Sequence, residues 1–132
     1  MIIADMSIWS QALRGQSPGL QSLFNDLRLR GELSAPGWVF AQLLSEAEDD
    51  RQADRLREWA ADTVALEESP NAWIAAGDLH VHFAQHGIRL SLMDSYIVAL
   101  CLREALELWS FNPIFDEVAR LTALHRYMPT GM

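Results

Sequence analysis

The sequence predicts an α/β fold: a single domain with a mostly parallel central sheet flanked by helices. Short apolar runs without helical spacing alternate along the chain with longer segments whose apolar residues recur at helical spacing. The length of 132 residues is typical of one domain, and half of the residues are hydrophobic, which is enough for one core. No internal repeat, low-complexity segment or linker interrupts the pattern. We therefore expect residues 1–132 to form one domain.

The first half of the chain is predicted to begin with a buried strand and to continue mainly as helices. Met1–Ala4 is an uninterrupted apolar run, typical of a buried strand, and Ser7 can cap the helix that follows. The sequence GQSPG predicts a loop before the second helix. In chain order the predicted elements are a strand over 1–4, a helix over 7–13, a helix around 20–27 that ends near Gly31, a short extended segment in LSAPG, a helix over 38–46 and a charged helix over 48–61.

The second half repeats the alternation of strands and helices. Its most regular helix is expected over Ser91–Glu107, with Ile97, Cys101 and Leu108 on one buried face. The other predicted elements are a short strand over 63–66, a helix over 70–85, an extended segment over 88–90, a strand over 108–111, a helix over 113–124 and an edge strand over 126–128.

Composition and charge limit the classes of function. The net charge is −8 and every basic residue except histidine is an arginine, which argues against sequence-blind binding of nucleic acid and suits a basic protein partner. A nuclease remains compatible with this charge, because a metal site concentrates carboxylates. The sequence contains no apolar run long enough to span a membrane. Its first residues include no basic stretch and no long apolar region, so we expect no signal peptide. The lone Cys101 has no disulfide partner, so we expect a core position and a cytoplasmic location.

Two aspartates lie where a predicted strand or extended segment passes into a helix. Asp5 follows the first strand, and Asp94 lies in GIRLSLMDSYIVAL. In open α/β sheets, ligands bind at the carboxyl ends of strands, so this pair is a candidate site. A structural alternative exists for each residue. Ser91 and Asp94 have the spacing of a capping box, and Asp5 could cap the first helix, although Ser7 can do so as well.

The order of these motifs resembles that of a PIN domain, specifically the VapC-like toxins of bacterial toxin–antitoxin pairs. MIIADMSIW resembles the opening strand of the family, with Asp5 as its acid and Ser7 as its small hydroxyl residue. APGWVFAQLL resembles the segment that carries a glutamate early in a helix, at the position that Gln42 fills here. GIRLSLMDSYIVAL resembles the strongest motif, with Asp94 as its acid.

A fourth segment, LWSFNPIF, resembles the Thr-x-Asp-x-x-Phe motif of the family. Ser110, Asn112 and Phe115 fill its three fixed positions. The four matches cover nearly the whole chain in the right order and at plausible spacings. Together they identify the chain as a PIN-like domain over residues 1–132.

The resemblance implies a metal-dependent nuclease that cleaves RNA, with Mg²⁺ or Mn²⁺ held by carboxylates. Asp5 and Asp94 would be the metal ligands, and Ser7 would support Asp5 or a water on the metal. Ser110 and Asn112 would orient such waters. The family also implies an antitoxin protein as partner and a homodimer. The catalytic set implied by the resemblance is Asp5, Asp94, Gln42, Asn112, Ser7 and Ser110.

Two positions depart from the family pattern. Gln42 stands where a glutamate is expected and Asn112 where an aspartate is, and an amide brings no negative charge and cannot serve as a base. We therefore expect low or absent activity. Glu46, one turn after Gln42, and Asp116 are candidate substitutes, although Asp116 also suits the first turn of the last helix. Asn112 followed by Pro113 is also a sound helix start without any role at a metal.

Two alternatives to an active enzyme follow. The first is a binding module in which the catalytic set has decayed and the acidic pocket binds a basic partner, such as an antitoxin tail. The second is another small α/β protein whose Asp5 and Asp94 only cap helices and lie far apart.

Other features are of lesser weight. His82 and His86 lack a third ligand, which makes a poor zinc site. A partner groove is expected over the first two helices, lined by Trp9, Leu13, Leu23 and Phe24.

Overall fold

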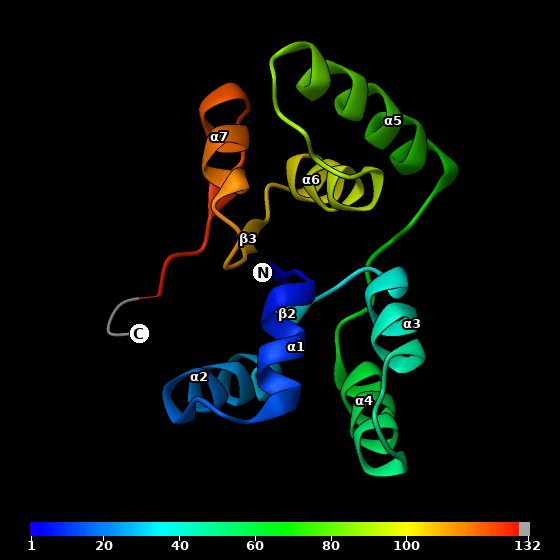
Figure 1. Cartoon of the computed structure of the whole chain (residues 1–132), viewed down its shortest axis with the longest axis vertical. Helices are drawn as coiled ribbons and strands as arrows, with labels where there is room; N and C mark the ends of the chain where they lie inside the picture. Colours follow the sequence, from blue (N-terminus) through cyan, green and yellow to red (C-terminus); the bar gives the residue numbers. More distant parts are fainter. Residues whose placement is uncertain (130–132) are drawn as a thin grey trace.

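The computed structural model of the chain describes residues 1–129, and a parallel four-stranded sheet lies at its centre (Figure 1). The strand order is β2-β1-β3-β4, and each neighbouring pair is parallel. Ile2 pairs with Leu33 on one side, and Ala4 pairs with Trp109 on the other. The strands are β1 (Ile2–Ala4), β2 (Leu33–Ser34), β3 (Glu107–Trp109) and β4 (His125–Arg126). The α/β prediction is confirmed.

Helices flank this sheet in two groups. In Figure 1, α1 to α4 gather in the lower half of the molecule and α5 to α7 in the upper half, with the strands between them. The helices are α1 (Met6–Arg14), α2 (Pro18–Leu29), α3 (Gly37–Ser45), α4 (Asp50–Asp62), α5 (Pro70–Gln85), α6 (Leu92–Glu104) and α7 (Ile114–Leu121). All seven were predicted to within a few residues. Within residues 1–129, no helix combines the length and the apolar character that a membrane span requires.

An aromatic cluster forms the core between α1, α2 and α4. Trp9 and Phe24 are fully buried, and their rings meet edge to face at 4.9 Å. Trp59 of α4 lies 4.9 Å from Phe24, and the indole nitrogen of Trp9 donates a hydrogen bond of 3.0 Å to the carbonyl of Ala4. Edge-to-face pairs add to the stability that burial alone provides. Trp9 and Phe24 are therefore core residues, and the prediction that they line a partner groove is wrong.

The structure differs from the sequence prediction in several local features. Residues 63–66 form no strand; they run as an irregular, partly exposed segment, and the hydroxyl of Ser34 donates to the carbonyl of Val64. Helix α6 ends at Glu104, because Ala105 adopts a left-handed conformation with φ of 52°. The next residues pair with β1, so Leu108 lies in β3 rather than on the helix face of Cys101. Cys101 itself is buried, as predicted. The edge strand is confirmed as β4, one residue earlier than expected.

Candidate functional site

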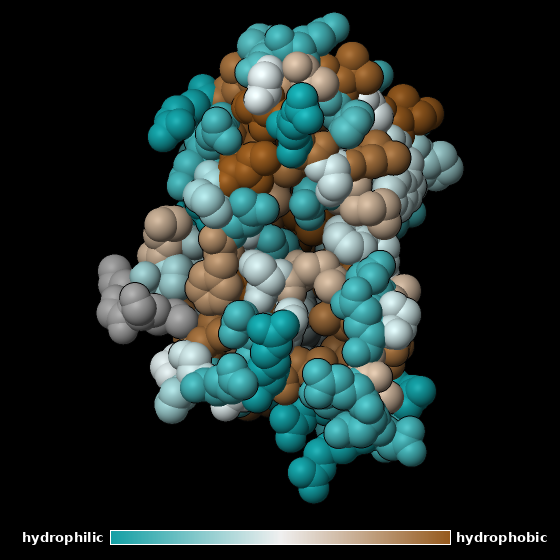
Figure 2. Space-filling model, viewed as in Figure 1, coloured by the Kyte–Doolittle hydropathy of each residue, from teal (hydrophilic) through white to brown (hydrophobic). Residues whose placement is uncertain are grey.

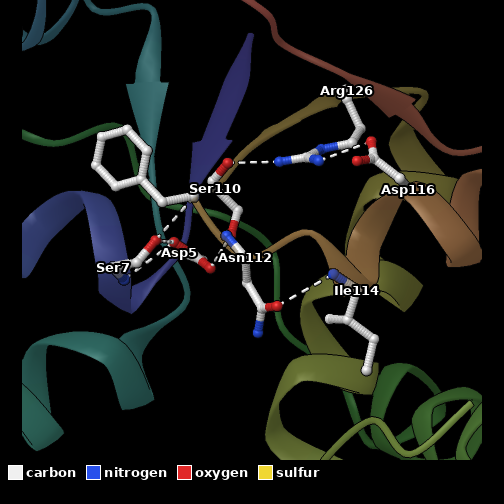
Figure 3. Close-up of polar contacts among 8 residues, drawn as sticks. Asp5, Ser7, Ser110, Asn112, Ile114, Asp116 and Arg126 are labelled. Carbon is white, nitrogen blue, oxygen red and sulfur yellow. Dashed lines mark hydrogen bonds and ion pairs between the residues drawn. The ribbon is translucent and has the colours of Figure 1, made fainter.

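The candidate site lies at the carboxyl ends of β1 and β3. Because Ala4 pairs with Trp109, the residues that follow them, Asp5 and Ser110, come side by side. The hydroxyl of Ser110 donates a hydrogen bond to Oδ2 of Asp5, which joins two segments far apart in sequence (Figure 3).

Asp5 directly follows strand β1 and caps helix α1. Its Oδ1 accepts from the main-chain N–H of Ser7 at 3.0 Å, from the Ser7 hydroxyl at 2.6 Å and from the N–H of Ile8 at 3.4 Å. Only 4% of Asp5 is exposed. Asp5, rather than Ser7, therefore caps α1, and Ser7 contacts the carboxylate instead.

The turn after β3 is held tightly around this carboxylate. The N–H of Phe111 donates to the Ser7 hydroxyl at 3.1 Å, and the N–H of Asn112 donates to the Ser110 hydroxyl at 3.0 Å. The side-chain oxygen of Asn112 accepts from the N–H of Ile114 at 3.1 Å, as Figure 3 shows. This last bond places the Asn112 oxygen at the start of α7, which supports the helix-cap interpretation of that residue.

Asp94 lies in the first turn of α6, within electrostatic range of Asp5. Burial raises the pKa of Asp94 above its ordinary value of 3.8, and the negative charge of Asp5 raises it further, while the hydrogen bond with Ser91 acts in the opposite direction. The Ser91 hydroxyl accepts from the N–H of Asp94 at 3.0 Å, so the predicted cap is present as well. The influence of one carboxylate on the other argues against the alternative in which the two lie far apart. A bound cation would relieve their repulsion.

Gln42 makes no hydrogen bond to Asp5 or Asp94 among the residues that the structure describes. Its side-chain amide on α3 instead donates to Oε1 of Glu46 at 2.8 Å, and both side chains are exposed. Glu46, the candidate substitute for the missing glutamate, is thus hydrogen-bonded to Gln42, the residue that stands at that glutamate's position. The structure brings together Asp5, Ser7, Ser110 and the main chain of Asn112, with Asp94 nearby, and it leaves Gln42 outside this network.

Arg126 supports the site from the edge strand, and sequence reasoning missed it. Its guanidinium forms an ion pair of 2.8 Å with Asp116 and donates to the carbonyl of Ser110 (Figure 3). Asp116 lies in the first turn of α7, as predicted, and its carboxylate is engaged by Arg126. No local pattern predicts these contacts, because only the pairing of β4 with β3 brings Arg126 to Ser110.

The family model described as the PIN domain matches residues 2–121. The chain belongs to the PIN domain family. A comparison with curated protein sequences finds no significant match.

Solved structures share the fold of this PIN domain at low sequence identity. A chain of VapBC2 from Rickettsia felis, bound to a DNA fragment from its promoter, superposes with a TM-score of 0.77 at 17% identity; 96% of this chain and 98% of that chain are covered. A chain of DNA-bound VapBC from Salmonella typhimurium gives 0.78 at 15% identity, with 96% of each chain covered. A chain of FitAcB from Neisseria gonorrhoeae gives 0.72 at 17% identity, with both chains fully covered. At these identities the likeness shows the fold.

The donor set of this PIN domain fits one weakly held hard cation. Within residues 1–129, no three histidine, cysteine or acidic side chains gather as a metal cluster. The rings of His82 and His86 lie 4.5 Å apart with no third ligand. Asp5 and Asp94 remain as a carboxylate pair, and Oδ2 of Asp5 accepts a single hydrogen bond, which leaves it an acceptor position. Mg²⁺ is often held by one or two carboxylates that water and substrate phosphate complete.

Proposed function

We propose that this PIN domain is an endoribonuclease of the VapC toxin type that depends on Mg²⁺ or Mn²⁺ and cleaves RNA phosphodiester bonds. The observation that carries the proposal is the buried Asp5 carboxylate, fixed by Ser7 and Ser110 and close enough to Asp94 to raise its pKa. The toxin–antitoxin complexes among the structural neighbours support the same function. A stability role alone does not require two carboxylates that repel each other.

Asp5 and Asp94 are the proposed ligands of the cation. When bound, a divalent cation lowers the pKa of a coordinated water and offsets the charge of the scissile phosphate. Ser7 and Ser110 hold the Asp5 carboxylate in one orientation through their hydroxyl groups. We assign to Ser110 and Asn112 the orientation of water at the site, with the smaller part for Asn112, because its side-chain oxygen is engaged at the start of α7.

Gln42 is proposed to weaken this activity. The family resemblance puts a glutamate of the metal site at this position. An amide there carries no negative charge, and its hydrogen bond holds it to Glu46. The test is RNA cleavage with Mg²⁺ or Mn²⁺, in which this chain is compared with Gln42→Glu. Asp94→Asn placed in the Gln42→Glu background is the control. We expect Gln42→Glu to cleave faster than this chain, and the Asp94→Asn control to abolish that cleavage. Cleavage that survives Asp94→Asn contradicts the site assignment.

A binding module with a decayed catalytic set is the second candidate. The observation that favours it is the Gln42–Glu46 hydrogen bond, which engages the amide that stands at the position of the family's glutamate. In this case the pocket binds a basic antitoxin segment, which the net charge of −8 suits. Absence of cleavage by both this chain and Gln42→Glu, together with tight binding of the antitoxin, would favour this candidate.

We also propose that the chain pairs as a homodimer and resides in the cytoplasm. Exposed apolar side chains line α5, and Figure 2 shows hydrophobic residues gathered over the end of the molecule where α5 lies. Ile74 is 64% exposed and Val81 is 55% exposed. Such a patch is typical of an interface. Light scattering should give twice the chain mass, and Ile74→Asp should give a monomer.

The reduced, buried thiol of Cys101 suits a cytoplasmic location.

A further inference from the structure

A large aromatic side chain stands exposed at the rim of the candidate site. Phe111 follows Ser110 directly, and 52% of it is exposed to solvent. Only two hydrogen bonds separate its main chain from the Asp5 carboxylate: Phe111 N–H to the Ser7 hydroxyl at 3.1 Å, and that hydroxyl to Asp5 at 2.6 Å. The turn that holds the Asp5 carboxylate thus carries an exposed phenyl ring.

The main chain around Phe111 is rigidly held on both sides. Ser110 donates to Asp5 through its hydroxyl and accepts from Arg126 through its carbonyl. Asn112 is tied to Ser110 through its N–H and to Ile114 through its side chain. Because the main chain of this turn is already ordered, a ligand that contacts Phe111 need not order it, which favours recognition.

The charges of the protein offer an RNA strand little attraction. Within the described part of the chain, five of the ten arginines form ion pairs with acidic side chains, and Arg126, which contacts Ser110, is one of them. Binding of RNA by a chain with a net charge of −8 therefore depends on contacts other than neutralisation of phosphates. Stacking of bases on aromatic side chains is such a contact, and it tolerates any base.

We propose that Phe111 is a substrate-binding residue that stacks on an unpaired nucleobase beside the phosphodiester to be cleaved. This inference rests on the proposed ribonuclease function and adds to it a residue of this chain that contacts the base next to the scissile bond. In a duplex the face of each base is covered by its neighbours, so Phe111 cannot reach it. The residue contributes affinity and selects unpaired strands, while Asp5 and Asp94 remain responsible for the chemistry.

The test is a binding measurement with a fluorescently labelled single-stranded RNA of about 12 nucleotides, a length near the upper range of single-strand sites. Fluorescence anisotropy is recorded with Mg²⁺ for the wild type, Phe111→Leu and Phe111→Trp, and gels confirm that the RNA stays intact. Phe111→Leu keeps an apolar side chain but removes the aromatic plane. Leu29→Ala, at a 74% exposed position on α2, is the matched control for loss of exposed apolar surface.

We expect Phe111→Leu to weaken binding about tenfold, because stacking contributes about 1–3 kcal/mol per base and 1.4 kcal/mol corresponds to tenfold. Phe111→Trp should retain affinity, and Leu29→Ala should bind as the wild type does. A series of RNAs, each with one abasic position, tests whether the effect of Phe111→Leu and the effect of losing one particular base depend on each other. At one position, loss of the base should weaken wild-type binding by the same factor and leave Phe111→Leu unaffected.

Failure of this inference is distinguishable from failure of the proposed function. If the wild type binds single-stranded RNA and Phe111→Leu binds it equally well, Phe111 is no stacking residue and the ribonuclease proposal stands. Additive effects of Phe111→Leu and of every abasic position also overturn the inference. If the wild type binds no RNA, and neither it nor Gln42→Glu cleaves any, the proposed function is overturned and this inference with it.

Discussion

Replacement of Ser110 by alanine removes the hydrogen bond that holds Oδ2 of the buried Asp5 carboxylate. The hydroxyl donates to Oδ2 of Asp5 and accepts from the N–H of Asn112 at 3.0 Å, and both interactions disappear with it. The main-chain carbonyl of Ser110 remains, so its bond from Arg126 is retained. The substitution therefore isolates the side chain that joins β3 to β1 at the site.

The expected loss is about 2.5–4 kcal/mol in the free energy of unfolding. A hydrogen bond to a charged group contributes about 1.5–3 kcal/mol, and the half-buried N–H of Asn112 loses an acceptor that contributes about 1 kcal/mol. Ser34→Ala is the matched control. Ser34 is fully buried at the end of β2, and its hydroxyl donates to the neutral carbonyl of Val64 at 2.6 Å. That bond should contribute only about 1 kcal/mol.

Urea unfolding at neutral pH without divalent metal measures both variants. Equal slopes of free energy against urea concentration would show that the two transitions are comparable. The reasoning is refuted if Ser110→Ala is no more destabilising than Ser34→Ala, since the Asp5 carboxylate would then not depend on its donor.

Three further predictions concern the surroundings of the site and the core. Asp94→Asn should stabilise the metal-free protein at neutral pH. The pKa of Asp94 is higher in the native state than in the unfolded chain. Between these two pKa values the native protein binds more protons than the unfolded chain does. The stability of the wild type therefore falls as the pH rises through that range. Thermal unfolding from acid to neutral pH should show this fall for the wild type and a smaller fall for the variant. Arg126→Ala should lower the free energy of unfolding by about 1.5–3 kcal/mol, chiefly because the hydrogen bond to the Ser110 carbonyl is lost. The ion pair of Arg126 with half-exposed Asp116 contributes little. If urea unfolding gives the same stability for Arg126→Ala and the wild type, the contact with Ser110 is contradicted. Burial raises the pKa of the Cys101 thiol to about 12. A thiol reagent should therefore label the native protein far more slowly than the protein unfolded in urea. Equal labelling rates would show that the thiol is accessible in the native protein.

Much of the fold could be predicted because its patterns are local. Apolar runs indicated β1 and β3, and helical spacing indicated α2 to α6. The end of α6 could not be predicted, because its helical pattern continues through the residues that form β3. The left-handed Ala105 ends the helix without a glycine to signal it, and pairing of Glu107–Trp109 with β1 decides the outcome.

The candidate site was only partly predictable for a similar reason. Asp5 and Ser110 follow from the rule that parallel strands end at one edge. Which of Asp5 and Ser7 caps α1 could not be decided, since both residue types are good caps. Arg126 reaches the site through strand pairing alone and leaves no local signal. Phe111 lies inside a recognised motif, but its exposure depends on how the surrounding turn is tied to Ser7.

Titration of the protein with Mn²⁺ by isothermal calorimetry tests most directly whether Asp5 and Asp94 hold a cation. Asp94→Asn removes a proposed ligand, and Asp116→Asn is the matched control, because the Asp116 carboxylate is engaged by Arg126. We predict saturable binding of one Mn²⁺ per chain for the wild type and for Asp116→Asn, and its loss in Asp94→Asn. Absence of binding to the wild type, or equal binding to Asp94→Asn, would contradict the assignment of the site.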